Sequence, residues 1–323
     1  MLCPFCLARV RFTQQQDNHR VTYRCPECHQ RVPPMYVERY GKGPVVMNAI
    51  GFRGHGKTVY FSSLFYTFAQ PELCQSWSGF YTMCLNEDSL ETVNRNRDRL
   101  REGYLPDATA KNFPSPTIMH IGGIPNYGSR TLLFYDTGGE AFERASQITE
   151  YAKFVMRAHT AVFLVSIRDL QNPAEQMHHL LNTYIIGMTD LGGQTKDQNL
   201  LVVYTKADDL PEQYAGNCHP QATQGTWRGF NIQQYLEEGT LEALKELRAY
   251  ENGMRQGSKQ LRNFTLDTLR ANNFVNLAEQ SFRSVKFCAV SALGTRPMED
   301  GRLQVAVEPR RILDPLLWLL AQR

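Results

Sequence analysis

Four short, mostly apolar runs recur along the chain at wide intervals. They cover residues 45–50, 131–135, 199–204 and 285–290, and each has the length of a buried strand. Helical patterns follow two of them, at residues 59–69 and 141–158. Strands that are apolar throughout are typical of parallel sheets covered on both faces. The pattern therefore indicates an α/β fold.

Two longer segments interrupt this alternation and are interpreted as inserts, at about residues 70–108 and 211–283. The first predicts a strand at 79–85 and a helix at 86–102, which Asn86 caps and Gly103 ends. Its arginine-rich run at 95–101 fits a solvated helix face, and contact with a partner or lipid headgroups is the open alternative. The second insert has a polar stretch at 216–225 and helical patterns at 241–250 and 260–282. Its position predicts a partner surface or a lid.

Composition excludes several classes of protein. The chain has 323 residues, of which 42% are hydrophobic and 21% charged, so disorder, a fibrous repeat and a disulfide-dense mini-protein do not fit. A formal charge of +3 argues against a general nucleic-acid binder, because phosphate neutralisation needs a larger basic excess. No apolar run reaches the length of a transmembrane helix, and the N-terminus lacks the pattern of a signal peptide. We expect a cytoplasmic protein.

Eight cysteines are the unusual feature of the composition, and four of them form two Cys-x2-Cys pairs. Cys3, Cys6, Cys25 and Cys28 have the spacing of a four-thiolate zinc site. Alternating residues at 9–13 and 20–24 predict two strands joined by a turn at 14–19, as in a zinc ribbon. About 30 residues cannot bury enough core to fold alone, so zinc would supply the folding energy. The other cysteines are expected to act as small hydrophobic residues: Cys74, Cys84, Cys218 and Cys288.

A proline-rich linker at 32–35 and a glycine-rich one at 40–44 divide the chain into a ribbon, residues 1–40, and a larger domain, residues 41–323. Basic residues of the ribbon fit either a protein-docking module or a nucleic-acid contact, of which we favour docking. They are Arg9, Arg11, Arg20, Arg24 and Arg31.

The run that follows the first apolar strand is Gly-x4-Gly-Lys-Thr, the sequence of a phosphate-binding P-loop. Its glycines allow backbone N–H groups to converge on phosphate oxygens at a helix N-terminus. Lys57 is expected to reach the β- and γ-phosphates, and the Thr58 hydroxyl to ligate Mg²⁺. We interpret His55 as part of the loop structure rather than as a base. The predicted nucleotide-binding residues here are Gly51, Arg53, Gly54, His55, Gly56, Lys57, Thr58 and Val59.

Polar residues also end the three later strands. Asp136, at the end of the second strand, can hold Mg²⁺, and Gly139 allows the backbone to approach the γ-phosphate. Asp208 can accept two hydrogen bonds from guanine, which adenine does not offer, while the stem of Lys206 covers the base. The base pocket is completed by Thr205 and by the backbone of Ser291, Ala292 and Leu293.

In this order, the motifs resemble the Ras-like and Arf-like branch of TRAFAC-class P-loop GTPases. The ribbon, residues 105–109, residues 291–294 and residues 313–318 are, more narrowly, similar to prokaryotic double-GTPase-type proteins. The resemblance implies a partner GTPase or regulator in a bacterial conflict or membrane-associated system. It also implies a switch threonine ahead of the hairpin formed by 117–121 and 130–135. Thr109 fits that place, whereas Thr117 falls within the hairpin.

The chain departs from that family at three positions. Thr205 replaces the usual Asn, which we expect to weaken the internal hydrogen bonds of the loop. Glu140 stands where a water-orienting Gln is common, and its charge would repel the γ-phosphate and slow hydrolysis. The alternative is that Glu140 only begins the helix at 141–158. Arg53 replaces a smaller residue and can crowd a partner's arginine or supply positive charge itself.

Together these observations predict a doubly wound, mostly parallel α/β sheet with helices on both faces, preceded by a zinc ribbon. The expected function is a GTP-binding molecular switch that hydrolyses GTP with Mg²⁺, slowly without a partner. Its catalytic residues would be Lys57, Thr109, Gly139 and Glu140, with Thr58, Thr109 and Asp136 holding Mg²⁺. The alternative is a catalytically weak, nucleotide-dependent scaffold whose ribbon binds protein or nucleic acid.

Overall fold

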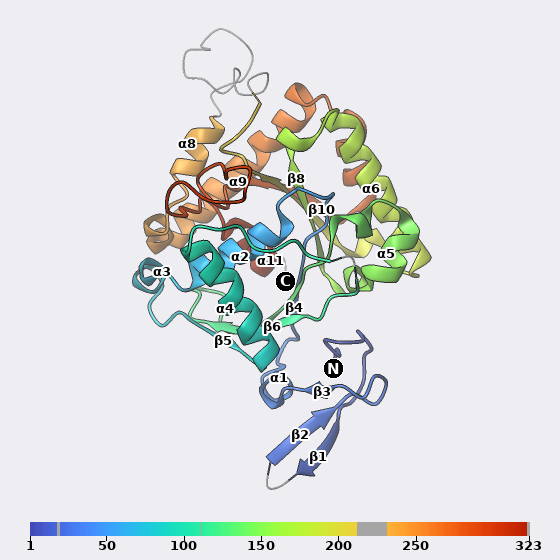
Figure 1. Ribbon diagram of the computed structural model, residues 1–323. Coiled ribbons are helices and arrows are strands. Elements are labelled where there is room, and N and C mark those ends of the chain that lie inside the picture. The colour runs from blue at the N-terminus through green and yellow to red at the C-terminus, as the bar shows by residue number, and fades with distance from the viewer. Residues whose placement is uncertain (18–19, 111, 212–230, 322–323) are drawn as a thin grey trace.

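A seven-stranded twisted sheet forms the centre of the protein, seen in a computed structural model that describes residues 1–17, 20–110, 112–211 and 231–321 (Figure 1). The order is β10-β9-β8 in one half and β4-β7-β6-β5 in the other. The halves meet where Ile50 N–H donates to Val162 O at 2.9 Å and Leu164 N–H donates to Ile50 O at 2.7 Å. The strands are β4 (Val45–Asn48), β5 (Tyr81–Cys84), β6 (Thr117–Gly122), β7 (Arg130–Tyr135), β8 (Thr160–Ser166), β9 (Asn199–Thr205) and β10 (Ser284–Ala289).

Helices cover both faces of this sheet, because strand residues alternate between two buried apolar clusters. One face carries α2 (Lys57–Phe68) and α11 (Asp314–Ala321). The other carries α5 (Ala145–Tyr151), α6 (Pro173–Asp190) and α10 (Asn272–Ser281). Strands β4, β5, β7, β8, β9 and β10 run in one direction, and β6 runs opposite to them, so that it pairs antiparallel with both β5 and β7. The predicted doubly wound α/β fold is confirmed.

The antiparallel half of the sheet follows the sequence prediction closely. Strands β6 and β7 form the expected hairpin, in which Thr117 pairs with Phe134. β5 adds to the edge of β6, and α4 (Glu87–Arg101) follows it and ends before Gly103, which has a φ of +78°. A short α3 (Pro71–Ser76) precedes β5. The strand and the helix predicted in the first insert are both confirmed.

The second insert forms a helical layer beside β10. It comprises α8 (Ile232–Glu237), a 3₁₀ turn (Glu242–Glu246), α9 (Leu247–Asn263), a π-helical turn (Phe264–Thr268) and α10. The sequence predicted that a helix ends at residue 250, but α9 continues through this position. The side chains of Tyr250, Met254 and Leu261 are all buried along one side of the helix. The polar stretch at 216–225 lies outside the described residues.

The helix predicted at 141–158 is wrong. A 3₁₀ turn (Gly139–Phe142), α5 and a second 3₁₀ turn (Lys153–Arg157) replace it, separated by extended backbone at Arg144 and a break at Ala152. The breaks bury Phe142 and Phe154 completely. A single straight helix would present only one stripe to the core. Strand β8, which follows this segment, was not predicted.

The ribbon is a small antiparallel sheet of β1 (Thr13–Asp17), β2 (Arg20–Arg24) and β3 (Arg31–Val32). Its first strand begins at Thr13, four residues later than predicted, so Gln14, Gln15 and Gln16 are strand residues and not a turn. The predicted linker at 32–35 is also wrong, because it contains β3 and the start of α1 (Pro34–Glu38). Tyr36 of this helix is fully buried and donates to Leu2 O at 2.7 Å.

Direct contacts join the ribbon to the larger domain, below the sheet in Figure 1. The Tyr135 hydroxyl, at the end of β7, donates to Pro4 O at 2.5 Å, and Arg157 Nε donates to Leu7 O at 2.9 Å. The Tyr135 ring also stacks on Phe154 at 4.9 Å. Ribbon and domain side chains form one continuous apolar cluster. The ribbon therefore packs on the segment that leads into Asp136.

A buried ionic cluster fixes the C-terminal helix α11. Asp314 is fully buried and accepts hydrogen bonds from the Tyr235 hydroxyl at 2.8 Å and the Tyr250 hydroxyl at 2.5 Å. Arg311, 3% exposed, lies 3.9 Å from the same carboxylate, with its guanidinium over both tyrosine rings. Burial raises the pKa of Asp314, and Arg311 opposes that shift. The cluster ties the second insert to α11.

Asp314→Ala is expected to lower the free energy of unfolding by about 3–5 kcal/mol, because it leaves the Arg311 cation buried without its counter-ion. Urea unfolding followed by circular dichroism measures the change. Asp314→Asn keeps an acceptor for the tyrosines and is expected to cost less. A loss below about 1 kcal/mol for the alanine variant would show that Arg311 finds other compensation.

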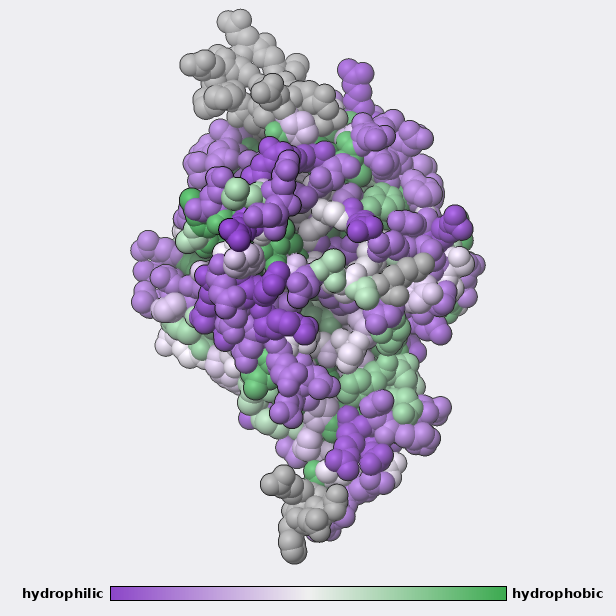
Figure 2. All heavy atoms as spheres, in the orientation of Figure 1, coloured by the Kyte–Doolittle hydropathy of each residue, from purple (hydrophilic) through white to green (hydrophobic). Residues whose placement is uncertain are grey.

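The surface is largely hydrophilic on the face shown in Figure 2, with small apolar patches between polar side chains. Large exposed hydrophobic residues are scattered over several elements, among them Leu90, Ile186 and Val305. Within the described part of the chain, no helix combines the length and apolar character needed to cross a membrane.

Candidate functional site

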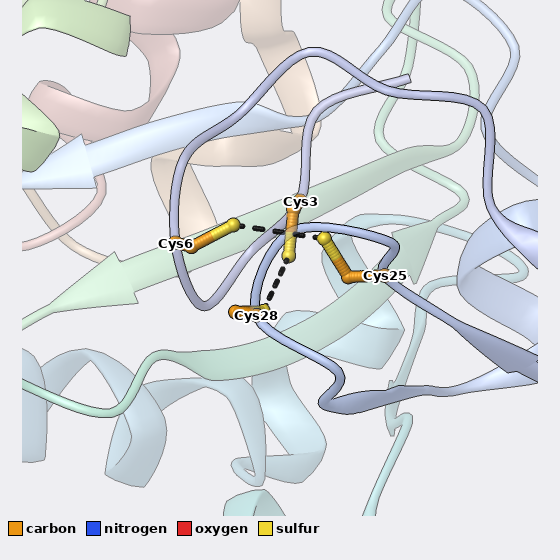
Figure 3. Close-up of side chains that lie close together, drawn as sticks. All are labelled: Cys3, Cys6, Cys25 and Cys28. Atoms are coloured by element: carbon orange, nitrogen blue, oxygen red, sulfur yellow. Dashed lines mark hydrogen bonds between the residues drawn. The ribbon is translucent and has the colours of Figure 1, made fainter.

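The four predicted zinc ligands converge on one point (Figure 3). Their sulfur atoms all lie within 4.8 Å of one another, with Cys3 and Cys28 3.8 Å apart and Cys6 and Cys25 3.6 Å apart. Four sulfurs at about 2.3 Å from a zinc ion stand roughly 3.8 Å apart at the corners of a tetrahedron. The donor set and its spacing therefore fit a structural zinc ion.

Two matching turns present these sulfurs. Leu7 N–H donates to Cys3 O at 3.0 Å, and His29 N–H donates to Cys25 O at 2.9 Å. Leu7 and His29 both have positive φ, of 66° and 58°, so each chain turns back directly after the second cysteine of its pair. Burial raises the pKa of the Cys3 thiol. A bound metal favours the thiolate and opposes that effect.

Of the other cysteines, Cys288 is fully buried beside the core, as predicted, and Cys84 is half-buried. Cys74 is exposed, so it does not act as a buried hydrophobic residue, because the short α3 leaves this side chain at the surface. Cys218 lies outside the described residues.

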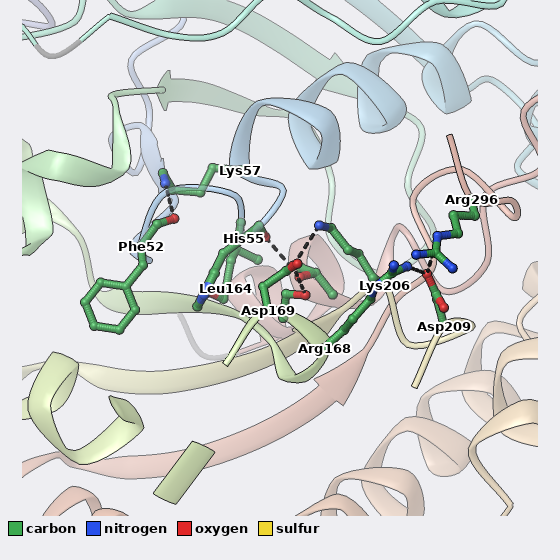
Figure 4. Close-up of polar contacts among 11 residues, drawn as sticks. Phe52, His55, Lys57, Leu164, Arg168, Asp169, Lys206, Asp209 and Arg296 are labelled. Atoms are coloured by element: carbon green, nitrogen blue, oxygen red, sulfur yellow. Dashed lines mark hydrogen bonds and ion pairs between the residues drawn. The ribbon is translucent and has the colours of Figure 1, made fainter. Parts of the chain in front are cut away.

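The P-loop joins β4 to α2 at the carboxyl edge of the sheet. Gly54 and Gly56 have φ of 84° and 77°, and a Cβ on Gly51 would lie 2.4 Å from Leu164 O. Glycine is therefore required where the loop turns and where it crosses β8. Lys57 Nζ donates to Gly51 O and to Phe52 O, both at 2.9 Å (Figure 4). Burial lowers the pKa of this ammonium to about 8, although Asp136 and Glu140 oppose the shift.

Three oxygen-bearing side chains from separate segments meet beside Lys57. Thr58 Oγ1 lies 2.7 Å from Thr109 Oγ1, and the Thr109 hydroxyl donates to Asp136 Oδ2 at 2.8 Å. Asp136 Oδ1 is buried and has no hydrogen-bond partner among the described residues. Hydroxyl and carboxylate oxygens are the ligands that Mg²⁺ prefers. The orphaned oxygen and this donor set fit a magnesium ion. Thr117, by contrast, is buried within β6.

Gly139 and Glu140 close the cavity on the side of the P-loop. A Cβ on Gly139 would lie 2.2 Å from Arg53 N, so only glycine permits this approach. Glu140 lies in the turn that follows, and its carboxylate is 3.8 Å from the Arg53 guanidinium. Arg53 is 84% exposed, so this ion pair is weak. Both side chains line the same cavity.

The opposite end of the cavity holds the predicted base-binding residues. The Thr205 hydroxyl donates to His55 O at 2.9 Å, so threonine still joins this motif to the P-loop. Lys206, with a φ of 52°, donates to Asp169 Oδ2 at 2.7 Å. Asp208 is exposed, lines the cavity and accepts no hydrogen bond from a described residue. Its carboxylate is therefore accessible to a ligand.

The last motif follows β10 and contributes backbone to the same end. Ser291 is 1% exposed and its hydroxyl accepts from Gly294 N–H at 2.9 Å. Ala292 and Leu293 line the cavity, whereas the Ser291 side chain does not. Ser63 of α2 donates to Ala292 O at 2.6 Å and holds this turn against the helix.

One cavity of about 730 Å³ connects these elements. This volume is ordinary for a site that binds a ligand of nucleotide size. The sequence-predicted residues along it come from the P-loop, the switch segment, the end of β7 and the two base motifs: Arg53, Gly54, Gly56, Lys57, Thr58, Val59, Thr109, Gly139, Glu140, Thr205, Lys206, Asp208, Ala292 and Leu293.

The charged residues of this cavity that the sequence prediction missed include Arg168 and Asp169. Arg168 pairs with Asp209, which also lies 3.9 Å from Arg296, while Asp169 holds Lys206 (Figure 4). Arg168 and Asp169 both follow β8, whose continuous apolar run at 161–165 is a signal that could have located them.

The side chain of His55 does not line this cavity. It is 2% exposed, and its Nδ1 lies 3.1 Å from Leu164 O. Burial lowers the pKa of His55 to about 4, mainly because a charged ring would lose its hydration. The residue holds the P-loop against β8, in agreement with a structural role.

Protonation of His55 is expected to destabilise the fold in acid. Between pH 6.5 and 4 the unfolded chain binds a proton that the folded protein excludes, so stability falls by about 3 kcal/mol as the pH is lowered through this window. Denaturant unfolding at several pH values measures the slope. In His55→Gln, which keeps a donor toward Leu164, this part of the slope is expected to disappear; an unchanged slope would assign it to other groups.

A family model for Double-GTPase 2 matches residues 46–228, which includes the P-loop, the Asp136 motif and the Thr205–Asp208 motif. That match covers more than half of the chain. The chain belongs to the Double-GTPase 2 family. A guanine nucleotide is accordingly the ligand that membership in this family suggests. No curated protein matches the chain.

Several solved structures have a distant similarity to this Double-GTPase 2 protein. A mutation variant of SsGBP is 12% identical, with a TM-score of 0.30, over 80% of this chain and 54% of its own. The S. cerevisiae Ski7 GTPase-like domain, bound to GDP and inorganic phosphate, is 12% identical, with a TM-score of 0.33, over 88% of this chain and 51% of its own. The signal recognition particle receptor SRb-GTP/SRX complex from Chaetomium thermophilum is 14% identical, with a TM-score of 0.31, over 80% of this chain and 94% of its own. The chain spans about half the length of the first two.

Proposed function

We propose that the protein is a molecular switch that binds GTP with Mg²⁺ and hydrolyses it slowly. The observation that carries this proposal is the convergence of Thr58, Thr109 and Asp136 beside Lys57. Thr58, Thr109 and Lys57 line the cavity that Asp208 also lines, and Asp136 lies behind Thr109 within hydrogen-bonding distance. The first group suits the charge of a metal-bound triphosphate, and Asp208 suits the donor edge of guanine. Thr58, Asp136 and Asp208 follow β4, β7 and β9, at the carboxyl ends of strands, where ligands bind in open α/β sheets.

The roles of the residues follow from their positions. Lys57 and the backbone N–H groups of the P-loop would neutralise and orient the phosphates. Thr58, Thr109 and Asp136 would hold Mg²⁺, which supplies charge neutralisation at the phosphate oxygens. Asp208 would orient the base, and the Asp169 carboxylate keeps Lys206 in place beside it. Positioning and electrostatics account for catalysis in this scheme, without a covalent step.

The switch itself would be the segment that carries Thr109 together with the turn that carries Gly139. Gly138 N–H donates to Ala110 O at 3.3 Å, and Thr137 donates to Asn112 O at 2.9 Å, so the two segments already contact each other. The γ-phosphate would contact both the Thr109 segment and the Gly139 turn. Its loss on hydrolysis would release both and change the surface that they present. We propose protein effectors or a partner GTPase as the readers of that surface, and a cytoplasmic location.

Slow hydrolysis follows from Glu140, whose negative charge lies in the cavity close to Arg53. Glu140→Gln removes this charge while keeping a side chain that orients water, so single-turnover hydrolysis of GTP is expected to rise about tenfold. Glu143→Gln, three residues later and exposed, is the matched control and is expected to leave the rate unchanged. A lower rate in Glu140→Gln would instead assign the carboxylate a direct part in positioning the water.

Glu140 also supports a second candidate function, that of a catalytically weak scaffold. If single-turnover hydrolysis is absent in both the parent protein and Glu140→Gln, while GTP still binds, the protein acts as a nucleotide-dependent scaffold. Tyr135, one residue before Asp136, contacts the ribbon. The ribbon is therefore the surface that we expect to respond to the bound nucleotide.

A further inference from the structure

A second cavity, of about 400 Å³, lies between the ribbon and the larger domain. One wall is the segment that leaves α1 and enters β4, and the other is the face of the β6–β7 hairpin. We call it the basic cleft, because it carries three cationic side chains and one acidic one. It is lined by Glu38, Arg39, Tyr40, Gly41, Lys42, Gly43, His120, Ser129, Arg130 and Thr131.

The cations of the basic cleft are not neutralised by the protein. Arg39, Lys42 and Arg130 form no ion pair with any residue in the described parts of the chain. Glu38 contributes the one carboxylate among the described residues that line the cleft. Elsewhere on the surface, arginines such as Arg99, Arg168 and Arg262 do pair with acids. The cleft therefore holds a local positive excess that a bound anion would satisfy.

A buried histidine adds an unsatisfied polar atom to the cleft. His120 is 3% exposed, and its Nδ1 lies 3.2 Å from Thr131 Oγ1. Its Nε2 is buried and has no hydrogen-bond partner among the described residues. Burial and the Arg39 charge both lower the pKa of His120, so the ring is neutral at physiological pH. When the Thr131 hydroxyl donates to Nδ1, the single N–H of the neutral ring is on Nε2 and needs an acceptor.

We propose that the basic cleft binds a phosphate-bearing ligand, with Arg39, Lys42 and Arg130 neutralising the phosphate and His120 donating to it. Guanidinium groups match phosphate oxygens in pairs, and lysine adds a point charge, which is the usual chemistry of such sites. A free phosphate compound and a lipid headgroup share this chemistry. The cavity exceeds the volume of a lone phosphate, which leaves space for the group that carries it.

This site is separate from the nucleotide cavity. Arg130 and Thr131 begin β7, whereas Asp136 follows its other end, so the two sites lie at opposite edges of the sheet, roughly 20 Å apart along the strand. Among the described residues, none lines both cavities. A ligand in the basic cleft would contact both the segment after the ribbon and the β6–β7 hairpin, and so would fix the ribbon against the domain.

The test uses the whole 323-residue chain, loaded with zinc, in the presence of saturating GDP and Mg²⁺. Inorganic phosphate binding is followed by phosphorus NMR line broadening, and membrane binding by sedimentation with phosphatidylcholine vesicles that contain or lack phosphatidic acid. The variant Arg39→Ala/Lys42→Ala/Arg130→Ala is compared with Lys196→Ala/Arg248→Ala/Lys259→Ala. The control removes the same charge from exposed positions outside the cleft.

The cleft variant is expected to lose at least about tenfold in affinity relative to the control for one of the two probes. His120→Phe, which keeps the ring but removes its N–H, is expected to weaken the same probe. Selective loss of phosphate binding identifies a soluble ligand, and selective loss of binding to phosphatidic acid vesicles identifies a lipid headgroup. Equal binding of both probes by the cleft and control variants overturns the proposal.

Discussion

Removal of zinc is expected to unfold the ribbon and to destabilise the domain on which it packs. Structural zinc sites contribute about 10–16 kcal/mol of apparent binding free energy, which a segment of this size cannot replace from its own core. Cys25→Ser removes one of four sulfurs that lie within 4.8 Å of one another, and a chelator removes the ion itself. Both are expected to abolish the dispersed NMR signals of residues 1–32.

The effect should extend beyond the ribbon, because Tyr135 and Arg157 donate to the backbone of its first cysteine turn. Thermal unfolding of the domain is therefore expected at a lower temperature in Cys25→Ser than in the parent protein. Cys74→Ser, which changes an exposed thiol outside the cluster, is the matched control and is expected to keep both the zinc and the melting temperature. A folded ribbon in the presence of a chelator would contradict the zinc assignment.

Asp208→Asn is expected to weaken GTP binding by about a hundredfold to ten-thousandfold. The carboxylate of Asp208 would accept two hydrogen bonds from guanine, and hydrogen bonds to a charged group contribute about 1.5–3 kcal/mol each. Asparagine offers only one acceptor oxygen and turns a donor toward the second N–H of the base. Isothermal titration calorimetry with GTP and Mg²⁺ measures the loss.

Asp209→Asn is the control for this substitution, because it makes the same change of charge one residue away. The Asp209 carboxylate is held by Arg168 and Arg296, and so is less accessible to a base than that of Asp208. We expect a much smaller loss of affinity. Equal losses in the two variants would mean that charge, and not a specific contact with guanine, is responsible.

Features that depend on local chemistry were predictable from the sequence. The P-loop is defined by glycines whose positive φ and close approach to β8 allow no other residue, so its position and conformation follow from the motif. The arrangement of the four cysteines was predictable for a similar reason, because the two-residue spacing within each pair leaves few ways to arrange the sulfurs other than around one metal. The hairpin of β6 and β7 followed from two apolar runs that flank a single turn.

Features that depend on tertiary packing were not predictable from the sequence. The predicted helix at 141–158 is divided because Phe142 and Phe154 both reach the core, and a helical pattern alone does not show that demand. The ribbon's first strand begins at Thr13, which pairs with Arg24 immediately before Cys25, and alternation of side chains alone does not indicate this register. The buried cluster of Arg311, Asp314 and two tyrosines joins segments far apart in the chain, so no local pattern indicates it.

The positions of Thr109 and Asp136 show how the two kinds of information combine. The sequence predicts an acid at a strand end and a threonine ahead of a hairpin, and the fold brings them within 2.8 Å of each other beside Thr58. Arg168 and Asp169 were missed because β8 was not recognised as a strand. Once β8 is in place, its carboxyl end must reach the nucleotide cavity, and charged residues there become candidates for the base pocket.

The central claim is that this cavity binds guanine nucleotides selectively. Calorimetric titration of the zinc-loaded protein with GTP and with ATP, both in the presence of Mg²⁺, tests it most directly. The account predicts that GTP binds about a thousandfold more tightly or better, because adenine cannot satisfy the Asp208 carboxylate. Equal affinity for ATP and GTP would contradict it.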